Sequence, residues 1–260
     1  MADNKKDLLH SRRSPLRAAL FAVANTVLYT LEWFIAKSSK VSTTPFLPKE
    51  EFPWIPQMEA AAPKIREEVL ALLETKQHLP NFQEISKDQD QLTQDDHWKT
   101  VFFEAYGITS KANRERCPET AKAIDQVPNM KLAMLSIFSG NKHVPAHRGP
   151  YKGVIRYHLG LVVPQPEGSA RIRVGDQTRA WVEGESLVFD DSFNHEAWND
   201  AQDDRVVLFL DVVRPCRFPF NLLNSMIIGV IARSPFVRDL ERNQRAWEER
   251  YERAVAASAN

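Results

Sequence analysis

The chain has 260 residues, of which 43% are hydrophobic and 26% are charged, a composition that excludes a disordered chain and fits an ordinary globular protein. Lysine plus arginine and aspartate plus glutamate balance at 34 each, so we expect no nucleic-acid partner, because no global basic field would recruit one. The two cysteines, Cys117 and Cys216, are far apart without CxxC spacing, which argues against a zinc module or a disulfide scaffold.

Two apolar stretches lie near the ends of the chain. The first, AALFAVANTVLYTL at residues 18–31, has 14 residues, fewer than the roughly 20 that a spanning helix needs. The second covers residues 218–232. Arginines flank both stretches, as they flank segments that lie at an anionic lipid surface. The alternative is that both stretches pack on the protein's own core or on a partner. These arginines are Arg12, Arg13 and Arg17 before the first stretch, and Arg214, Arg217, Arg233 and Arg238 around the second.

The region between the first apolar stretch and residue 129 is predicted to be mainly helical. Residues 38–53 are polar and proline-containing, as in a linker. Residues 62–74, APKIREEVLALLE, predict a helix with Pro63 in its first turn. Residues 86–96 have the composition of a loop, and residues 117–127 predict a short helix that starts near its proline. The apolar stripe of the longer helix, expected to face the core, consists of Ile65, Val69, Leu72 and Leu73.

From about Met130 the chain changes to short β-like runs separated by turn residues, as in an antiparallel sandwich or barrel. In the second run Arg156 and His158 alternate with apolar residues, so a strand would place both on one face, lining a pocket or a wet surface. The GDQ turn of the third run predicts a hairpin. The runs are KLAMLSIF, GVIRYHLGLVVP, SARIRVGDQTRAWV, ESLVFDD and RVVLFLDVVRP.

Two histidines and an arginine stand at the ends of these runs. His147 lies in a proline- and glycine-rich turn, HVPAHRGPYKG, His195 follows 48 residues later, and Arg205 opens the last run ten residues after that. Imidazole suits Fe(II), and the planar fork of arginine binds a carboxylate bidentately. The spacing is therefore typical of a barrel-bound metal with a dicarboxylate cosubstrate. The ordinary alternative is a solvated histidine in an acidic turn and one half of a surface ion pair.

Three longer motifs, HRGPYKGVIRYHLGLVVP, WVEGESLVFDDSFNHEAWND and RVVLFLDVVRP, resemble the aspartyl/asparaginyl β-hydroxylase family of Fe(II)- and 2-oxoglutarate-dependent dioxygenases. The similarity covers roughly residues 98–215. Earlier segments, such as TPFLPKEEFPWIP and HWKTVFFEAYG, look more like the bacterial lipid hydroxylases of that family, the lipid A and ornithine-lipid types. The resemblance implies a mainly β fold, a double-stranded β-helix of the jelly-roll, cupin-like class with flanking α-helices. It also implies Fe(II), 2-oxoglutarate and O2.

The resemblance implies that His147 and His195 bind the iron and are the catalytic residues. The wider dioxygenase pattern has an aspartate or glutamate two residues after the first histidine, but this position is Gly149, which has no ligand atom. The site would then have two histidine ligands, with water filling the vacant position. Asp190 and Asp191 are candidates to orient His195 or to cap the turn, in preference to binding the metal.

The same resemblance implies a site for 2-oxoglutarate. Arg205 would anchor the carboxylate far from the metal, and Ser136 would help it. Arg156 and His158 would contact the carboxylate nearest the metal. These four residues match the family in type and spacing, as the two histidines do.

Four parts are expected along the chain: an amphipathic or membrane-associating segment with a linker at 1–45, a helical N-terminal part of the catalytic domain at 46–129, the β-helix core at 130–215, and an apolar and helical appendage at 216–260. The expected reaction is hydroxylation of an unactivated C–H bond. The basic, apolar termini favour an acyl chain of a membrane lipid as substrate, at the cytoplasmic side of a membrane to which the protein is bound peripherally or anchored. An aspartyl or asparaginyl side chain of a peptide or protein is one alternative, and a catalytically inactive β-helix that serves as a binding module is another.

Overall fold

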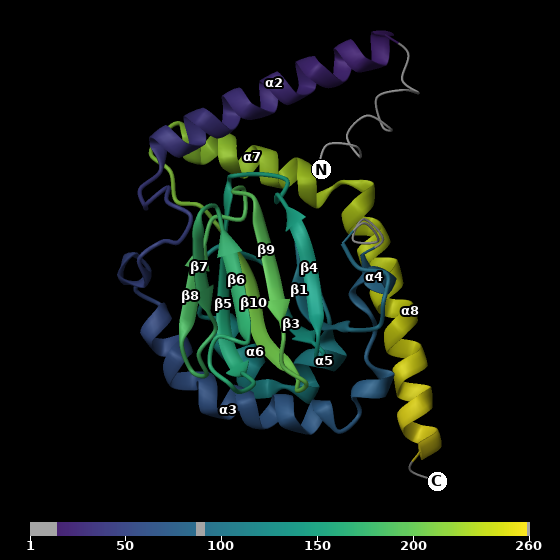
Figure 1. Cartoon of the computed structure of the whole chain (residues 1–260). Coiled ribbons are helices and arrows are strands. Elements are labelled where there is room, and N and C mark those ends of the chain that lie inside the picture. Colours follow the sequence, from purple (N-terminus) through teal and green to yellow (C-terminus); the bar gives the residue numbers. More distant parts are fainter. Residues whose placement is uncertain (1–14, 87–91, 259–260) are drawn as a thin grey trace, which may run out of the picture.

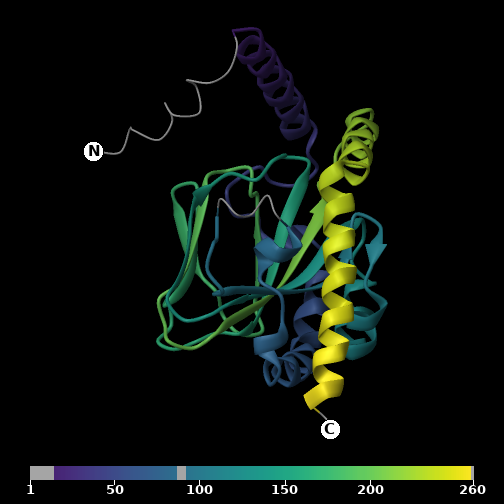
Figure 2. The ribbon, with the colours of Figure 1, turned by 90° about the vertical axis from the view of Figure 1, so that its right-hand side faces the viewer.

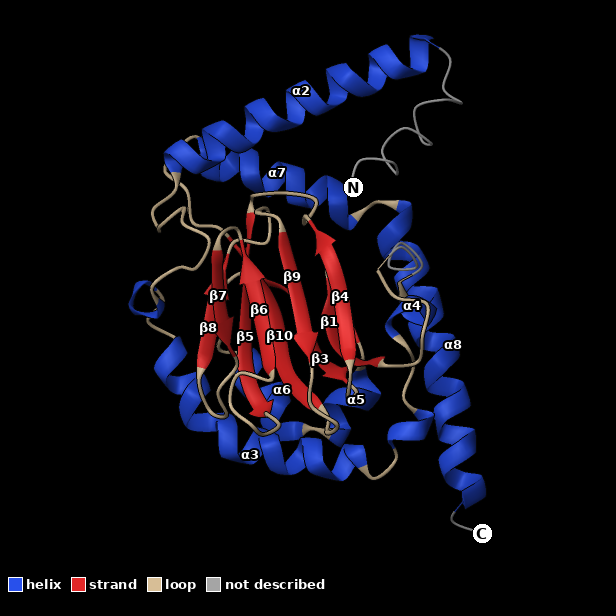
Figure 3. Ribbon diagram, viewed as in Figure 1, coloured by secondary structure: helices blue, strands red, loops and turns tan. Residues whose placement is uncertain are grey.

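The computed structural model describes residues 15–86 and 92–258. At its centre two antiparallel β-sheets face each other, and helices lie outside them (Figures 1 and 3). The larger sheet has the strand order β2-β1-β3-β10-β5-β8, and the smaller has the order β4-β9-β6-β7. This arrangement confirms the predicted mainly β, jelly-roll fold with flanking helices.

The predicted β-like runs all form strands. Buried apolar side chains from both sheets make the main core, and strands β3, β5 and β10 are buried along almost their whole length. The strands are β1 (Trp98–Ala105), β2 (Ile108–Thr109), β3 (Met130–Phe138), β4 (Lys142–His147), β5 (Val154–Val162), β6 (Ala170–Val174), β7 (Gln177–Ala180), β8 (Ser186–Phe189), β9 (His195–Asn199) and β10 (Arg205–Val213).

Strand β1 is the main addition to the sequence analysis, which began the sheet at about Met130. It pairs with β3 inside the larger sheet, so the part of the chain expected to be helical also supplies strands. Six of its eight residues are buried. Because both faces of β1 are covered, its sequence lacks the alternation of polar and apolar residues that marks a half-exposed strand.

The hairpin predicted in the third run is confirmed. The last residue pair between strands β6 and β7 is Val174 with Gln177, so Gly175 and Asp176 form the turn. Gly175 has a φ of +61°, a conformation that glycine adopts without strain. Gln177 belongs to the second strand rather than to the turn.

The helices are arranged around the sheets (Figures 1 and 2). Two of them, α2 and α7, lie at one end of the sheets, α3 lies at the opposite end, and α8 runs along the flank. The helices are α2 (Pro15–Ser38), α3 (Ile55–Leu73), α4 (Phe82–Ile85), α5 (Lys111–Arg116), α6 (Pro118–Ile124), α7 (Phe220–Ala232) and α8 (Pro235–Ser258), with 3-10 turns at Lys49–Glu51 and Lys76–His78.

Helix α3 begins earlier than its sequence predicts. It starts at Ile55, and Pro63 lies inside it rather than in its first turn. The neighbouring Pro56 occupies the first turn instead, where a missing amide hydrogen costs nothing. The predicted stripe is confirmed, because Ile65 and Val69 are buried in the core. The predicted short helix is α6, and the predicted loop at 86–96 lies partly outside the described residues.

The two apolar stretches form α2 and α7. Among the described helices, no single one is long and apolar enough to cross a bilayer. Helix α7 and the segment Val237–Tyr251, which meet at a bend of 50°, together have the length and composition of a membrane span. The stretch at 38–53 is not a free linker, because Phe46 forms a β-bridge with Phe189 and Leu47 N–H donates to the Val188 carbonyl. Arg12 and Arg13 lie outside the described residues.

Candidate active site

His147 and His195 face each other across two neighbouring strands. His147 is the last residue of β4, His195 is the first of β9, and the two are direct partners in the register. Their ring centroids are 4.1 Å apart. The prediction that His147 lies in a turn is therefore wrong, because it ends a strand. This strand is at the edge of its sheet, where Pro145 is tolerated because an outward-facing position needs no hydrogen bond to a neighbouring strand.

Both imidazole rings are held in the same way. Nδ1 lies 2.9 Å from the Pro145 carbonyl in His147 and 3.0 Å from the Phe193 carbonyl in His195. A carbonyl only accepts, so each Nδ1 carries the hydrogen and each Nε2 keeps a free lone pair. Burial lowers the pKa of both rings, that of His195 to about 3 with a further contribution from His147. Both are therefore neutral near pH 7, the form that binds a metal.

A narrow cavity between the two sheets collects the predicted residues. Its wall includes side chains from β3, β4, β5, β9 and β10, so both sheets contribute. The rest of the wall is apolar and largely aromatic. The structure thus brings together all six predicted positions: Ser136, His147, Arg156, His158, His195 and Arg205.

Arg205 is a cation buried in the wall of this cavity. It is 1% exposed, and among the described residues no carboxylate lies within ion-pair distance of it. Its guanidinium lies against the rings of Phe138 and Trp181, at 3.6 and 4.5 Å from their centroids, and donates one hydrogen bond of 3.2 Å to the Ser136 carbonyl. Its Nε has no hydrogen-bond partner among the described residues. Burial lowers the pKa of Arg205 to about 9, so it stays charged at pH 7. An isolated buried charge is costly, and an anion in the cavity would offset that cost.

Two neutral donors accompany Arg205. Trp98 Nε1–H donates to Ser136 Oγ at 3.1 Å, which leaves the serine hydroxyl hydrogen free to donate. Trp181 Nε1–H donates to His158 Nδ1 at 3.2 Å. An indole nitrogen only donates, so the hydrogen of His158 must be on Nε2, which is buried and has no partner among the described residues. These donors and Arg205 fit a dicarboxylate such as 2-oxoglutarate.

Arg156 differs from Arg205 in its charge balance. It forms ion pairs with Asp191 and Asp211, each at 2.9 Å. Arg156 and His158 share one face of β5, as predicted, and this face lines the cavity rather than a wet surface. Two carboxylates already compensate Arg156, so it contributes less net positive charge to the cavity than Arg205 does.

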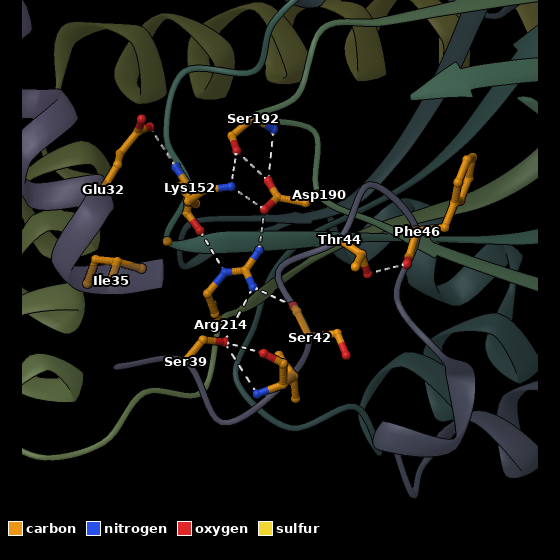
Figure 4. Close-up of polar contacts among 12 residues, drawn as sticks. Glu32, Ile35, Ser39, Ser42, Thr44, Phe46, Lys152, Asp190, Ser192 and Arg214 are labelled. Atoms are coloured by element: carbon orange, nitrogen blue, oxygen red, sulfur yellow. Dashed lines mark hydrogen bonds and ion pairs between the residues drawn. The ribbon is translucent and has the colours of Figure 1, made fainter. Parts of the chain in front are cut away.

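Asp190 has a structural role in the turn that precedes β9. Its carboxylate forms ion pairs with Arg214 at 2.7 Å and Lys152 at 2.6 Å, and accepts hydrogen bonds from the backbone N–H and the hydroxyl of Ser192 (Figure 4). Both oxygens of the Asp190 carboxylate are engaged in these contacts. Of the two roles that the sequence allowed for Asp190, the structure favours the turn.

Asp191 occupies the space beside Gly149. A Cβ atom built on Gly149 would lie 2.1 Å from Asp191 Oδ2, and Gly149 N–H donates to the Asp191 carbonyl at 2.8 Å. Asp191 is fully buried, and burial raises its pKa to about 6, against the opposing effect of Arg156. The position of the missing triad carboxylate is thus closed to any side chain while Asp191 stays in place. Among the described residues, no group of three or more His, Cys, Asp or Glu side chains is placed to hold a metal.

Replacing Gly149 with alanine is therefore expected to destabilise the protein by about 1–3 kcal/mol, because the added methyl overpacks the loop against Asp191. Urea unfolding of the metal-free protein measures this change. Gly229→Ala is the control: the nearest atom to its added Cβ is the end of the flexible Arg233 side chain, at 3.3 Å, and alanine has the higher helix propensity. Equal stability of Gly149→Ala and the unmodified protein would show that Asp191 moves aside freely.

Comparisons with known proteins find relatives that are similar in sequence. Residues 59–215 match the family model described as Aspartyl/Asparaginyl beta-hydroxylase. The chain is 40% identical over 224 residues to the ornithine lipid ester-linked acyl 2-hydroxylase of Rhizobium tropici, covering 86% of this chain and 80% of that protein. It is 31% identical over 156 residues to the human aspartyl/asparaginyl beta-hydroxylase, covering 58% of this chain and 20% of that protein. A solved prolyl hydroxylase from Trichoplax adhaerens aligns with 60% of this chain and 79% of its own, at a TM-score of 0.42 and 11% identity.

Proposed function

Because the chain belongs to the aspartyl/asparaginyl β-hydroxylase family, we propose that it is an Fe(II)- and 2-oxoglutarate-dependent dioxygenase that hydroxylates an unactivated C–H bond. The observation that carries this proposal is Arg205, a buried cation without an acidic partner among the described residues, in the same cavity as two neutral histidines. A fold gains nothing from such a charge unless an anion binds it. The argument against an inactive binding module is the complete set of six polar residues, two of them histidines, that converge on one cavity.

His147 and His195 would hold the iron through Nε2. When bound, the iron supplies the activation of O2 that couples decarboxylation of 2-oxoglutarate to insertion of one oxygen atom into the substrate. The carbonyls of Pro145 and Phe193 fix the two rings through Nδ1, so that both Nε2 atoms keep their direction. Arg205 would bind the far carboxylate of 2-oxoglutarate.

Three other residues would complete the binding of 2-oxoglutarate. Ser136 would donate its hydroxyl hydrogen, and His158 would donate from Nε2, beside Arg156. The aromatic wall of the cavity would exclude water, which strengthens each of these interactions.

We further propose that the substrate is an acyl chain of a membrane lipid and that the protein works at the cytoplasmic face of a membrane. The support is the relative from Rhizobium tropici, which by its name acts on an ester-linked acyl chain of ornithine lipid and whose length is 80% covered. The human relative acts, by its name, on aspartyl and asparaginyl residues, but only a fifth of it is covered. A peptide substrate is therefore the second candidate.

Deleting the gene in the source cell is expected to remove a lipid species that is heavier by one oxygen atom than its precursor. Mass spectrometry of lipid extracts from the deleted and parent strains measures this loss, and a plasmid copy of the gene should restore the species. An unchanged lipid profile, together with loss of hydroxylated aspartate or asparagine from a protein digest, would decide for the peptide substrate instead.

A further inference from the structure

We propose that α2 and α7 together form a docking surface for an anionic lipid bilayer, which holds the metal-binding end of the barrel at the membrane. This inference deepens the proposed function, on which its purpose depends, but its test is independent of catalysis. Among the described residues, ten large hydrophobic side chains are exposed, and eight of them belong to this docking surface. The eight are Val27, Tyr29, Trp33, Phe34, Phe218, Leu222, Met226 and Val230.

Helix α7 is apolar on two opposite faces. Its inner face buries Ile228 against the body of the protein. On the outer side an apolar residue recurs at every fourth position, starting at Phe218 just before the helix, and the four side chains are between 55% and 78% exposed. A surface helix of a soluble protein normally has polar residues on its outer face. A continuous apolar row in water indicates that another apolar phase covers it.

Helix α2 extends the same surface. Trp33 and Tyr29 are each more than half exposed, and these two residue types favour the boundary between water and lipid, where their rings have an apolar body and a polar edge. Phe34 stacks on Phe220 of α7, with ring centroids 5.4 Å apart and an angle of 11° between the planes. This contact joins the two helices into one surface.

The charges around the docking surface indicate that its partner is a negatively charged bilayer. Lys37, Lys40, Arg217 and Arg233 are exposed beside the apolar rows. Within residues 15–40 and 214–238 the sequence contains one acidic residue, Glu32, and it is buried and paired with a cation of the barrel. An apolar surface with a cationic rim is complementary to anionic headgroups over acyl chains.

The docking surface is fixed to the loop that follows His147. Glu32 of α2 accepts a hydrogen bond from the backbone N–H of Lys152 at 3.0 Å (Figure 4), and it also forms an ion pair with Arg148. Asn224 of α7 accepts a hydrogen bond from the Tyr151 hydroxyl at 3.0 Å. Both helices therefore hold the segment next to a proposed iron ligand. Docking through them would turn the end of the barrel that bears His147 and His195 toward the lipid (Figure 1).

Sedimentation of the whole protein with lipid vesicles tests the proposal. Vesicles of phosphatidylcholine with added phosphatidylglycerol should bind the protein, and vesicles of phosphatidylcholine alone should bind it more weakly. Met226→Glu and Leu222→Glu should each lower binding at least about tenfold, since each places a charge in the apolar phase. Arg217→Gln and Arg233→Gln should each lower binding to the anionic vesicles about fivefold.

Two matched substitutions serve as controls. Leu70→Glu changes an exposed leucine of α3, at the opposite end of the barrel, and Lys111→Gln changes an exposed lysine of α5. Both should bind vesicles as the unmodified protein does. Equal binding by Met226→Glu and Leu70→Glu would overturn the proposal. The proposal would also be overturned if the protein did not bind vesicles but formed a dimer that Met226→Glu dissociates. Vesicle binding without any hydroxylation would reject the proposed function alone.

Discussion

Replacing either His147 or His195 with alanine is expected to abolish the weak visible absorption band that should develop when Fe(II) and 2-oxoglutarate bind the protein in the absence of oxygen. The two ring centroids are 4.1 Å apart, and Nδ1 of each ring is bound to a backbone carbonyl, so each substitution removes one of the two proposed iron ligands. Hydroxylation should be lost with the band. Anaerobic titration followed by absorption spectroscopy gives the readout.

The matched control is His143→Ala. His143 lies on the same strand as His147, but it is half exposed and pairs with Glu196 outside the cavity at 2.8 Å. Its replacement should leave the band and the iron affinity unchanged. A band of normal intensity in both His147→Ala and His195→Ala would reject these residues as ligands.

Replacing Arg205 with methionine is expected to weaken 2-oxoglutarate binding by roughly ten- to 150-fold, which corresponds to the about 1.5–3 kcal/mol of a hydrogen bond with a charged partner. Iron should remain bound, because the histidines are untouched. The free energy of unfolding without ligand should not fall, because methionine fills the space and removes an uncompensated buried charge. Isothermal titration calorimetry and urea unfolding measure the two effects.

Arg214→Met provides the opposite case. Arg214 is as buried as Arg205, but it is paired with Asp190 and also donates to the Lys152 carbonyl. Its loss should cost about 3–5 kcal/mol of stability, because a buried carboxylate loses a partner, while the folded fraction still binds 2-oxoglutarate. If Arg205→Met were the more destabilised of the two, Arg205 would be a structural residue.

The strands from β3 onward could be predicted from local pattern, whereas the six cavity residues were identified together through the resemblance to the hydroxylase family. Alternation within β5 placed Arg156 and His158 on one face, and the spacing of His147 and His195 is set by strands of ordinary length. Strand β1 escaped prediction because its uninterrupted apolar run, Val101–Phe103, is only three residues long and has polar residues on both sides. The start of α3 was misplaced because Pro56 and Pro63 give the same local signal, and only packing decides between them.

Other features of the site depend on contacts between distant parts of the chain. Glu32 meets Arg148 across 116 positions, and Asp191 reaches Gly149 only because the turn before β9 folds back on the loop after β4. No local pattern encodes either contact. The family resemblance likewise assigned Arg156 and Arg205 to the same cosubstrate. Their different charge balance is visible only in the structure, where Asp191 and Asp211 lie beside Arg156.

The most direct test of acyl-chain hydroxylation supplies the purified protein with Fe(II), 2-oxoglutarate and lipid extracted from the gene-deleted cells, under an atmosphere of isotopically heavy oxygen gas. Mass spectrometry should find one heavy oxygen atom in the hydroxylated acyl chain and another in succinate, with succinate and hydroxylated lipid formed in equal amounts. Acyl chains without the heavy isotope, while 2-oxoglutarate is still consumed, would contradict a lipid substrate.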